Sequence, residues 1–118
     1  MTITRGRRPM RRTPSPLTST HKIGQNRGKR RIWLDGKRLA HARFIGGTHY
    51  DLEASEDIIV LTLNDQDGAR KVTGRPDGKP IIDIIGKVVS DAFAEYVTHV
   101  DVAFDKEGLI VIQPAKGE

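Results

Sequence analysis

The fold of this chain is decided by residues 32–52, IWLDGKRLAHARFIGGTHYDL, because the chain repeats this pattern fifty positions later. Residues 82–102 read IDIIGKVVSDAFAEYVTHVDV, which keeps the Gly-Lys pair and the Thr-His-x-Asp motif. When residues 32–63 are laid over residues 82–113 without a gap, seven positions are identical and several others exchange one aliphatic side chain for another. Such self-similarity indicates an internal duplication, whose two units are expected to pack about a pseudo-two-fold axis as two subunits would.

Each unit has the pattern of a strand, a short helix and a strand hairpin. Alternating apolar and polar residues predict strands, a glycine ends the first strand, and apolar residues one turn apart predict the helix. The elements predicted for the first unit are a strand over 31–35, a helix over 37–44 and strands over 48–54 and 58–63. The elements predicted for the second unit are a strand over 81–85, a helix over 87–96 and strands over 97–104 and 109–113. Residues 69–73 suit one additional strand.

The repeat also predicts the domain organisation. We expect a basic arm over residues 1–30, disordered in isolation, and one duplicated barrel domain over 31–118, with repeat one at 31–63, a linker at 64–80 and repeat two at 81–113. One unit alone has too little apolar surface to be stable, whereas two units can close one small core. The expected fold class is mainly β with short helices. The expected core residues are Ile32, Leu34, Leu52, Ile59, Leu61, Ile82, Ile84, Val100, Val102, Ile110 and Ile112.

The net positive charge is confined to the N-terminal part of the chain. Residues 1–31 contain ten Arg or Lys residues and no acidic residue, whereas residues 32–118 contain ten basic and fifteen acidic residues. A basic arm is typical of proteins that bind nucleic acid. The acidic remainder indicates that the folded part does not offer phosphate one broad positive face, and it suits a basic protein partner.

The composition excludes several classes of protein. The absence of cysteine excludes disulfides, thiol catalysis and zinc–thiolate sites. No apolar run reaches the roughly 18 residues of a membrane span, and the start of the chain lacks the apolar stretch of a signal peptide. We therefore expect a cytoplasmic protein, bacterial or from a phage, that uses no cofactor and contacts no membrane.

The first unit resembles a known family. Its pattern I-x-L-x-G-K-x-L-x-x-A-x-F-x-x-G, at residues 32–47, is similar to the core of SymE-like proteins, which belong to the SpoVT-AbrB swapped-hairpin superfamily. The second unit keeps the pattern as far as Ala92 but has Tyr96 and Val97 where the family has a glycine after the helix. A similar two-unit segment precedes the catalytic part of some phage-type cytosine methyltransferases. The resemblance covers residues 32–113.

The resemblance implies a pseudo-two-fold swapped-hairpin barrel built from two strand-helix-strand-strand repeats. One chain would supply both halves of what is a homodimer in most relatives. Proteins of this superfamily usually bind DNA, often to repress their own operon, and SymE-like proteins are described as toxins that act on nucleic acid. The resemblance therefore implies DNA binding and transcription regulation, in a toxin–antitoxin setting.

The candidate nucleic-acid-binding residues are cations of the arm, of the two helix starts and of the loop over residues 70–79. Arginine and lysine neutralise phosphates, and glycines let such a loop adapt to a backbone. Lys37 and Lys87 follow glycines at related helix starts, where a cation and backbone N–H groups together can hold a phosphate or a carboxylate. The alternatives are a simple strand-to-helix turn and a solvated linker. The predicted binding residues are Arg5, Arg7, Arg8, Arg11, Arg12, Arg27, Lys29, Arg30, Arg31, Lys37, Arg38, Arg70, Lys71, Arg75, Lys79 and Lys87.

Trp33 is the single tryptophan of the chain. A lone tryptophan in a small domain is typical of a core residue. The alternative is an outward position beside Arg30 and Arg31, where the indole could stack on a base.

The Thr-His-x-Asp motif places His49 with Asp51, and again His99 with Asp101, on one strand face away from their apolar neighbours. Two such pairs could bind a metal or act in acid–base chemistry. No third ligand and no nucleophile–base pair recurs in both units, so the motif predicts solvent-facing residues, with no metal site and no catalytic residue. His21 and the other unrepeated histidine, His41, are expected on the surface.

The sequence thus predicts a nucleic-acid-binding protein that is not an enzyme, with DNA expected ahead of RNA, acting as a monomeric pseudo-dimer or a homodimer. One alternative is a phage or mobile-element inhibitor or adaptor whose acidic body binds a nucleic-acid-handling host protein. A third hypothesis, implied only by the resemblance, is a SymE-like toxin directed at nucleic acid.

Overall fold

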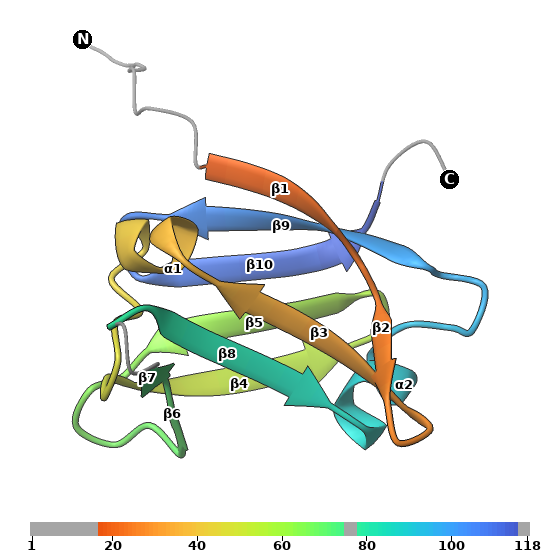
Figure 1. Ribbon diagram of the computed structural model, residues 1–118, viewed down its shortest axis with the longest axis horizontal. Helices are drawn as coiled ribbons and strands as arrows, with labels where there is room; N and C mark the ends of the chain where they lie inside the picture. Colours follow the sequence, from red (N-terminus) through yellow and green to blue (C-terminus); the bar gives the residue numbers. More distant parts are fainter. Residues whose placement is uncertain (1–16, 75–77, 116–118) are drawn as a thin grey trace, which may run out of the picture.

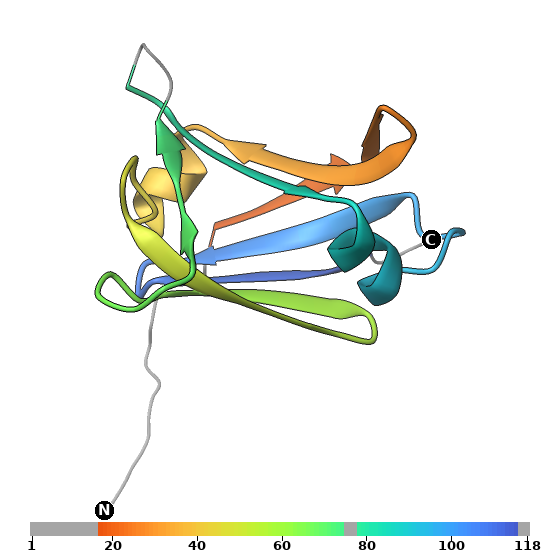
Figure 2. The same cartoon turned by 90° about the horizontal axis from the view of Figure 1, so that it is seen from below.

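The computed structural model describes residues 17–74 and 78–115, and these residues form two antiparallel sheets packed face to face (Figure 1). Figure 2 shows the smaller sheet lying over the larger one, with α1 (Lys37–His41) and α2 (Lys87–Ala92) at opposite ends of the two layers. The prediction of a mainly β fold with short helices is confirmed. Within the described ranges, neither helix has the length and hydrophobicity needed to cross a membrane.

The larger sheet has the strand order β1-β9-β10-β5-β4-β6. Its strands are β1 (Leu17–Lys22), β4 (His49–Ser55), β5 (Ile58–Leu63), β6 (Arg70–Lys71), β9 (His99–Asp105) and β10 (Leu109–Pro114). The smaller sheet has the order β2-β3-β8-β7. Its strands are β2 (Gly24–Asn26), β3 (Lys29–Asp35), β7 (Thr73–Gly74) and β8 (Pro80–Ile85). The order β3-α1-β4-β5 therefore occurs again as β8-α2-β9-β10.

The inner faces of the two sheets meet in one hydrophobic core. Among the expected core residues, Leu52 is half-buried at the edge of this core, and the others are buried. Phe44, Phe93 and Phe104 contribute the largest fully buried side chains. No polar or charged residue among those described is buried. The core is therefore held by apolar packing, without the cost of burying unpaired polar groups.

Residues 17–30 belong to the folded body, so the prediction of a disordered arm over residues 1–30 is wrong for this part. β1 pairs with β9 along its whole length, and β2 pairs with β3. Ile23, between β1 and β2, is buried, and its N–H donates to the carbonyl of Thr98 at 2.8 Å. Both strands lie at sheet edges, where polar side chains are common and hydrophobic alternation is weak. The rest of the predicted arm lies outside the described residues.

Both helices begin after a glycine and are shorter than predicted. Gly36 and Gly86 have φ of 84° and 89° with ψ of −153° and −136°, a backbone conformation that is essentially confined to glycine. α1 ends before Arg43, whose φ of 70° is left-handed, and α2 ends before Phe93, which is extended. These two breaks stop the helices and redirect the chain toward the core.

The two hairpins differ by one residue in their turns. The β4–β5 turn has two residues and the β9–β10 turn has three, as the registers of the two hairpins show. The longer turn includes Gly108, whose φ is 89°. The gapless alignment is therefore wrong in the last strand. Val60 corresponds in register and burial to Val111, its Cα partner in the sheet, and not to Ile110.

Candidate nucleic-acid interface

The β3–β8 ribbon presents one face to solvent on the side of the molecule seen in Figure 1. Side chains of paired strands alternate between the core and the solvent. Ile32 and Leu34 are buried, whereas Trp33 between them is 40% exposed. The outer face of this ribbon is thus free of the core and open to a partner.

The first lysine pair, Lys37 and Lys79, lies at one end of the ribbon. The Gly36 N–H donates to the carbonyl of Pro80 at 3.3 Å, which brings the start of α1 next to the start of β8. Both lysines are exposed. Arg38, the next residue of α1, is exposed as well. This end of the ribbon therefore concentrates positive charge.

The second lysine pair, Lys29 and Lys87, lies at the other end. The Gly86 N–H donates to the carbonyl of Arg30 at 2.9 Å, which brings the start of α2 next to β3. Both lysines are exposed and line a surface pocket of about 650 Å³. The Lys87 ammonium donates to the Asp91 carboxylate at 2.8 Å, and this hydrogen bond raises the pKa of Lys87.

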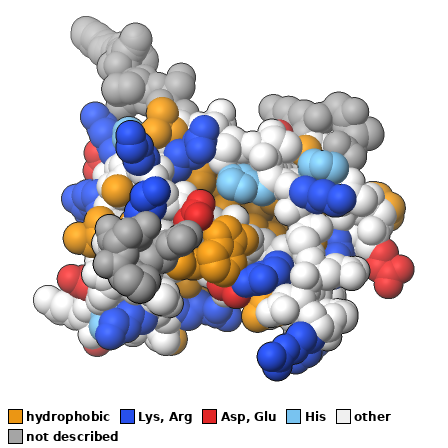
Figure 3. All heavy atoms as spheres, in the orientation of Figure 1, with side chains coloured by type: hydrophobic (Ala, Val, Ile, Leu, Met, Phe, Trp, Pro, Cys, Tyr) orange, Lys and Arg blue, Asp and Glu red, His pale blue; other side chains and the backbone are white. Residues whose placement is uncertain are grey.

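Six strand residues and one glycine lie between Lys29 and Lys37, and again between Lys79 and Lys87, so the two pairs are at most roughly 26 Å apart at the rise of a β-strand. Figure 3 shows basic side chains gathered at the α1 end and again near α2, with hydrophobic side chains exposed between them. The positive charge of the body is therefore split between two ends and does not form one continuous patch.

The guanidinium of Arg30 is engaged within the protein, and its assignment as a phosphate-binding residue stays a prediction. Its guanidinium donates to the carbonyl oxygens of Phe93, Ala94 and Val97 at 2.6, 3.2 and 2.7 Å. These carbonyls follow the end of α2, where the last helical carbonyls lack intrahelical partners. The side chain of Arg30 ties the segment after α2 to β3, and it also lines the pocket beside Lys29 and Lys87.

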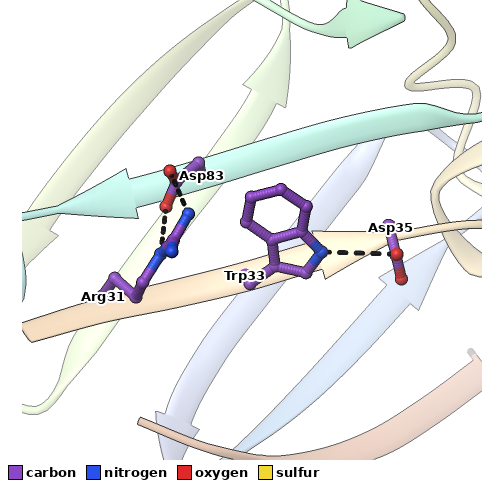
Figure 4. Close-up of polar contacts among 4 residues, drawn as sticks. All are labelled: Arg31, Trp33, Asp35 and Asp83. Atoms are coloured by element: carbon purple, nitrogen blue, oxygen red, sulfur yellow. Dashed lines mark hydrogen bonds and ion pairs between the residues drawn. The ribbon is translucent and has the colours of Figure 1, made fainter. Parts of the chain in front are cut away.

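Arg31 is also engaged, but on the surface. Its guanidinium forms a two-pronged ion pair with Asp83 on the neighbouring strand, with N–O distances of 3.1 and 2.6 Å. The same guanidinium lies 4.7 Å from the centre of the Trp33 ring, within the range of a cation–π interaction. The indole N–H donates to the Asp35 carboxylate at 3.3 Å (Figure 4). The prediction that Trp33 is a core residue is therefore wrong. Trp33 lies on the outer face beside Arg31, as the alternative prediction had it.

The other predicted binding residues of the body are scattered. Arg27 is exposed at the β2–β3 turn, and Lys71 is exposed on β6. Arg70 is half-buried beside Tyr50, whose pKa is raised by burial, while the positive charge and hydrogen bond of Arg70 act in the opposite direction. The predicted binding residues that lie outside the described ranges are Arg5, Arg7, Arg8, Arg11, Arg12 and Arg75.

The repeated His-x-Asp pairs lie on the outer face of the larger sheet, as predicted, and their side chains are half-buried. Asp51 accepts a hydrogen bond from the Asn64 side-chain amide at 2.8 Å, and Asp101 accepts one from the Thr20 hydroxyl at 2.7 Å. The structure does not bring them together: across residues 17–74 and 78–115, no three His, Cys, Asp or Glu side chains are placed to share a metal ion. Each carboxylate instead has a local partner that joins neighbouring segments of the sheet.

His21 is half-buried, and its pKa is lowered by burial and then by the positive charge of Arg38, while Asp35 acts in the opposite direction. The distance between Ser19 Oγ and His21 Nε2 is 2.6 Å. His41 is exposed, as predicted.

The reading of the sequence missed one repeated signal at the interface. Gly28-Lys29 returns as Gly78-Lys79, again fifty positions later, and both glycines have positive φ, of 80° and 88°. Each glycine belongs to the connection that leads into a ribbon strand. Lys29 and Lys79 are therefore equivalent positions, and they lie just before the repeat that begins at Ile32.

The chain was also compared with known proteins. No protein-family model, no curated protein and no solved structure matches it.

Proposed function

We propose that this protein binds nucleic acid, as a DNA-binding regulator of the SymE-like or SpoVT-AbrB type, through the outer face of the β3–β8 ribbon. The observation that carries the proposal is the presence of an exposed lysine pair at each end of this ribbon. Lysine pairs at opposite ends of the ribbon can contact phosphates that lie several base pairs apart.

We also propose that the chain is a tandem duplication closed into a swapped-hairpin barrel. Equivalent strands of the two units pair with each other, β3 with β8 and β5 with β10. Trp33 pairs with Asp83, its counterpart fifty positions on, and Val60 pairs with Val111. A two-fold axis that relates two antiparallel strands passes between equivalent residues, so both registers support one axis through the two sheets.

Contacts outside the sequence repeat support the same architecture. The Ile23 N–H donates to the carbonyl of Thr98, and the Val72 N–H donates to the carbonyl of Thr48, both at 2.8 Å. β1 therefore lies against β9 as β6 lies against β4. β1, which precedes the first unit, pairs with a strand of the second unit, and β6, which precedes the second unit, pairs with a strand of the first. Each unit therefore depends on the other for its edge strand.

The experiment is fluorescence anisotropy with labelled duplex DNA at several salt concentrations. The double variants Lys29→Ala/Lys87→Ala and Lys37→Ala/Lys79→Ala are expected to weaken binding and to make the log–log salt slope less negative by roughly 1.8 each. The matched control is Lys22→Ala/Lys106→Ala, which removes the same charge from exposed positions outside the ribbon. Equal losses of affinity in all three variants would indicate non-specific electrostatic attraction. The absence of binding at low salt would contradict the proposal.

A second candidate function is docking to a basic protein, and one feature of the larger sheet favours it. The outer face of that sheet carries half-exposed aliphatic side chains in place of the polar residues expected at a solvated face. They are Ile58, Val60, Ala103, Leu109 and Val111. Carboxylates on the same face surround them, namely Asp51, Glu53, Asp101 and Asp105. An apolar strip with an acidic rim suits a partner surface that is apolar and basic.

Affinity capture from nuclease-treated host lysate tests this second candidate. A partner identified by mass spectrometry should be retained by the unmodified protein and lost with Val111→Arg, which puts a positive charge into the apolar strip. Ser90→Arg adds the same charge on exposed α2 and should retain the partner. Retention of the partner by all three proteins would exclude the outer face of the larger sheet as its binding surface.

A further inference from the structure

The outer face of the β3–β8 ribbon holds a tryptophan in a fixed orientation. Arg31 covers the indole ring at 4.7 Å, and Asp35 accepts the indole N–H at 3.3 Å. Asp83 holds the Arg31 guanidinium through two contacts. Figure 4 shows the four side chains side by side on the two strands. The indole is held at its N–H and under Arg31, and a flat ligand can stack on the part of it that stays exposed.

The core does not require Trp33. Its neighbours Ile32 and Leu34 are completely buried and supply the inward packing of β3. Trp33 is 40% exposed on the opposite side of the strand. Stability therefore gains little from the part of the indole that faces solvent, whereas a large exposed aromatic surface is typical of a binding site.

The chemistry around the indole selects a base and not a phosphate. Aromatic rings and the planes of arginine guanidinium groups both stack on nucleobases. Asp35 and Asp83 repel phosphate, but carboxylates accept hydrogen bonds from amino groups of bases, as they do from cytosine N4. In an intact duplex the faces of the bases are covered by their neighbours, so only an unpaired base can stack here.

We propose that Trp33, Arg31, Asp35 and Asp83 form a stacking site for an unpaired base that carries an exocyclic amino group, in a single-stranded nucleic acid whose phosphates lie on the lysine pairs. This inference rests on the proposed nucleic-acid binding and adds a single-stranded ligand to the duplex proposed above. The site is single on the ribbon, because the positions on β8 equivalent to Arg31, Trp33 and Asp35 are Ile81, Asp83 and Ile85. The asymmetry gives the bound strand one direction.

The test uses the intrinsic fluorescence of the full-length protein, since Trp33 is the only tryptophan of the chain. Single-stranded homopolymers of dC, dA and dT and a mixed duplex are titrated at low salt, while anisotropy of a labelled strand reports binding independently. The dC and dA strands, whose bases carry amino groups, are expected to quench the Trp33 emission and to bind more tightly than dT.

Variants separate stacking from charge. Trp33→Ala is expected to weaken single-strand binding about 5- to 100-fold by anisotropy, the range found for loss of one stacked base, while Trp33→Phe keeps most of the affinity. The control is Tyr96→Ala, which removes another exposed aromatic ring, 83% exposed, and should leave binding unchanged. Asp35→Asn is expected to reduce the preference for dC over dT. Circular dichroism confirms that each variant is folded.

The outcomes distinguish this inference from the proposed function. Single-strand binding without quenching, or binding that Trp33→Ala leaves intact, overturns the stacking site but keeps nucleic-acid binding. Binding of duplex alone also overturns it and leaves the proposed duplex binding in place. The absence of binding to every labelled nucleic acid overturns both proposals together.

Discussion

At the scale of single residues, three consecutive cations on β3 have different surroundings. Lys29 is exposed at the end of the ribbon, Arg30 donates to carbonyl groups after α2, and Arg31 forms an ion pair with Asp83. Alternation along a strand separates neighbouring side chains onto opposite faces, so a run of like charges does not act as one patch. Charge counts along the sequence therefore overestimate the cations available to a ligand.

Arg30→Ala is expected to destabilise the protein, because carbonyl groups after α2 lose a charged hydrogen-bond donor. Hydrogen bonds to charged groups are each worth about 1.5–3 kcal/mol, so a loss of about 2–4 kcal/mol in the free energy of unfolding is expected. Urea denaturation measures it. Lys29→Ala, next along the strand and exposed, should leave stability within about 0.5 kcal/mol. Equal stability of both variants would contradict the structural role of Arg30.

His21 predicts a pH dependence of stability. Its pKa in the folded protein is lowered from 6.5 by burial and by Arg38, against the opposing effect of Asp35. Between the lowered pKa and 6.5, the unfolded chain binds more protons than the folded one, so stability falls as the pH falls through this window. Thermal unfolding between pH 5 and 7.5 should show the loss. His21→Gln should flatten the curve, whereas His41→Gln, an exposed control, should not.

At the scale of elements, each helix depends on the glycine before it. Neither α1 nor α2 has a side-chain cap, and both start from a glycine whose φ and ψ other residues adopt only under strain. Short helices have little stability of their own. Their position here comes from packing of Leu39 and Val89 into the core, and the glycine sets the angle at which each helix leaves its strand.

Gly36→Ala isolates this backbone effect, because a Cβ at residue 36 would meet no other atom within 4 Å. The expected cost is about 1–3 kcal/mol, caused by the positive φ alone. Chemical denaturation measures the change. Gly24→Ala is the matched control, since Gly24 has no positive φ and its Cβ would make only an ordinary contact with Arg31. A control as unstable as Gly36→Ala would refute this explanation.

At the scale of the whole molecule, the fold depends on contacts between distant parts of the chain. β1 closes one edge of the larger sheet against β9, and β3 pairs with β8 across the smaller sheet. The β4–β5 hairpin meets the β9–β10 hairpin through β5 and β10. From such long-range pairing we expect the body to unfold as one cooperative unit, so that removal of an edge strand affects the whole core.

Two truncations test this dependence. A chain that starts at Leu17 should keep the melting temperature of the full protein, whereas a chain that starts at Lys29 loses β1, β2 and buried Ile23 and should unfold. Circular dichroism and thermal melts give the result. Loss of five arginines in the first truncation should make the log–log salt slope for duplex DNA less negative by roughly 4.5. An unchanged slope would show that the arm does not contact phosphate.

Much of the fold could be predicted because short-range patterns encode it. β5 starts and ends at the predicted residues, and Ile32 and Leu34 are buried as alternation requires. The polar strand β1 could not be found in this way, because its partner β9 is about eighty residues away and supplies the hydrogen bonds that make it a strand. The candidate site could be predicted only in part. Lys37 and Lys87 are exposed at helix starts, as the sequence pattern indicates. The hydrogen bonds of Arg30 could not be predicted, because its carbonyl partners are more than sixty residues away along the chain.

The sequence by itself determined the repeated strand-helix-strand-strand order, the glycines that begin the helices and the residues that form the core. These properties depend on each residue and its near neighbours, through backbone conformation and the period of apolar side chains. The tertiary structure alone decided which strands became neighbours, that Trp33 faces outward, and which cations remain exposed. These depend on pairing between distant segments, where a single shift in register changes every partner and every exposed face.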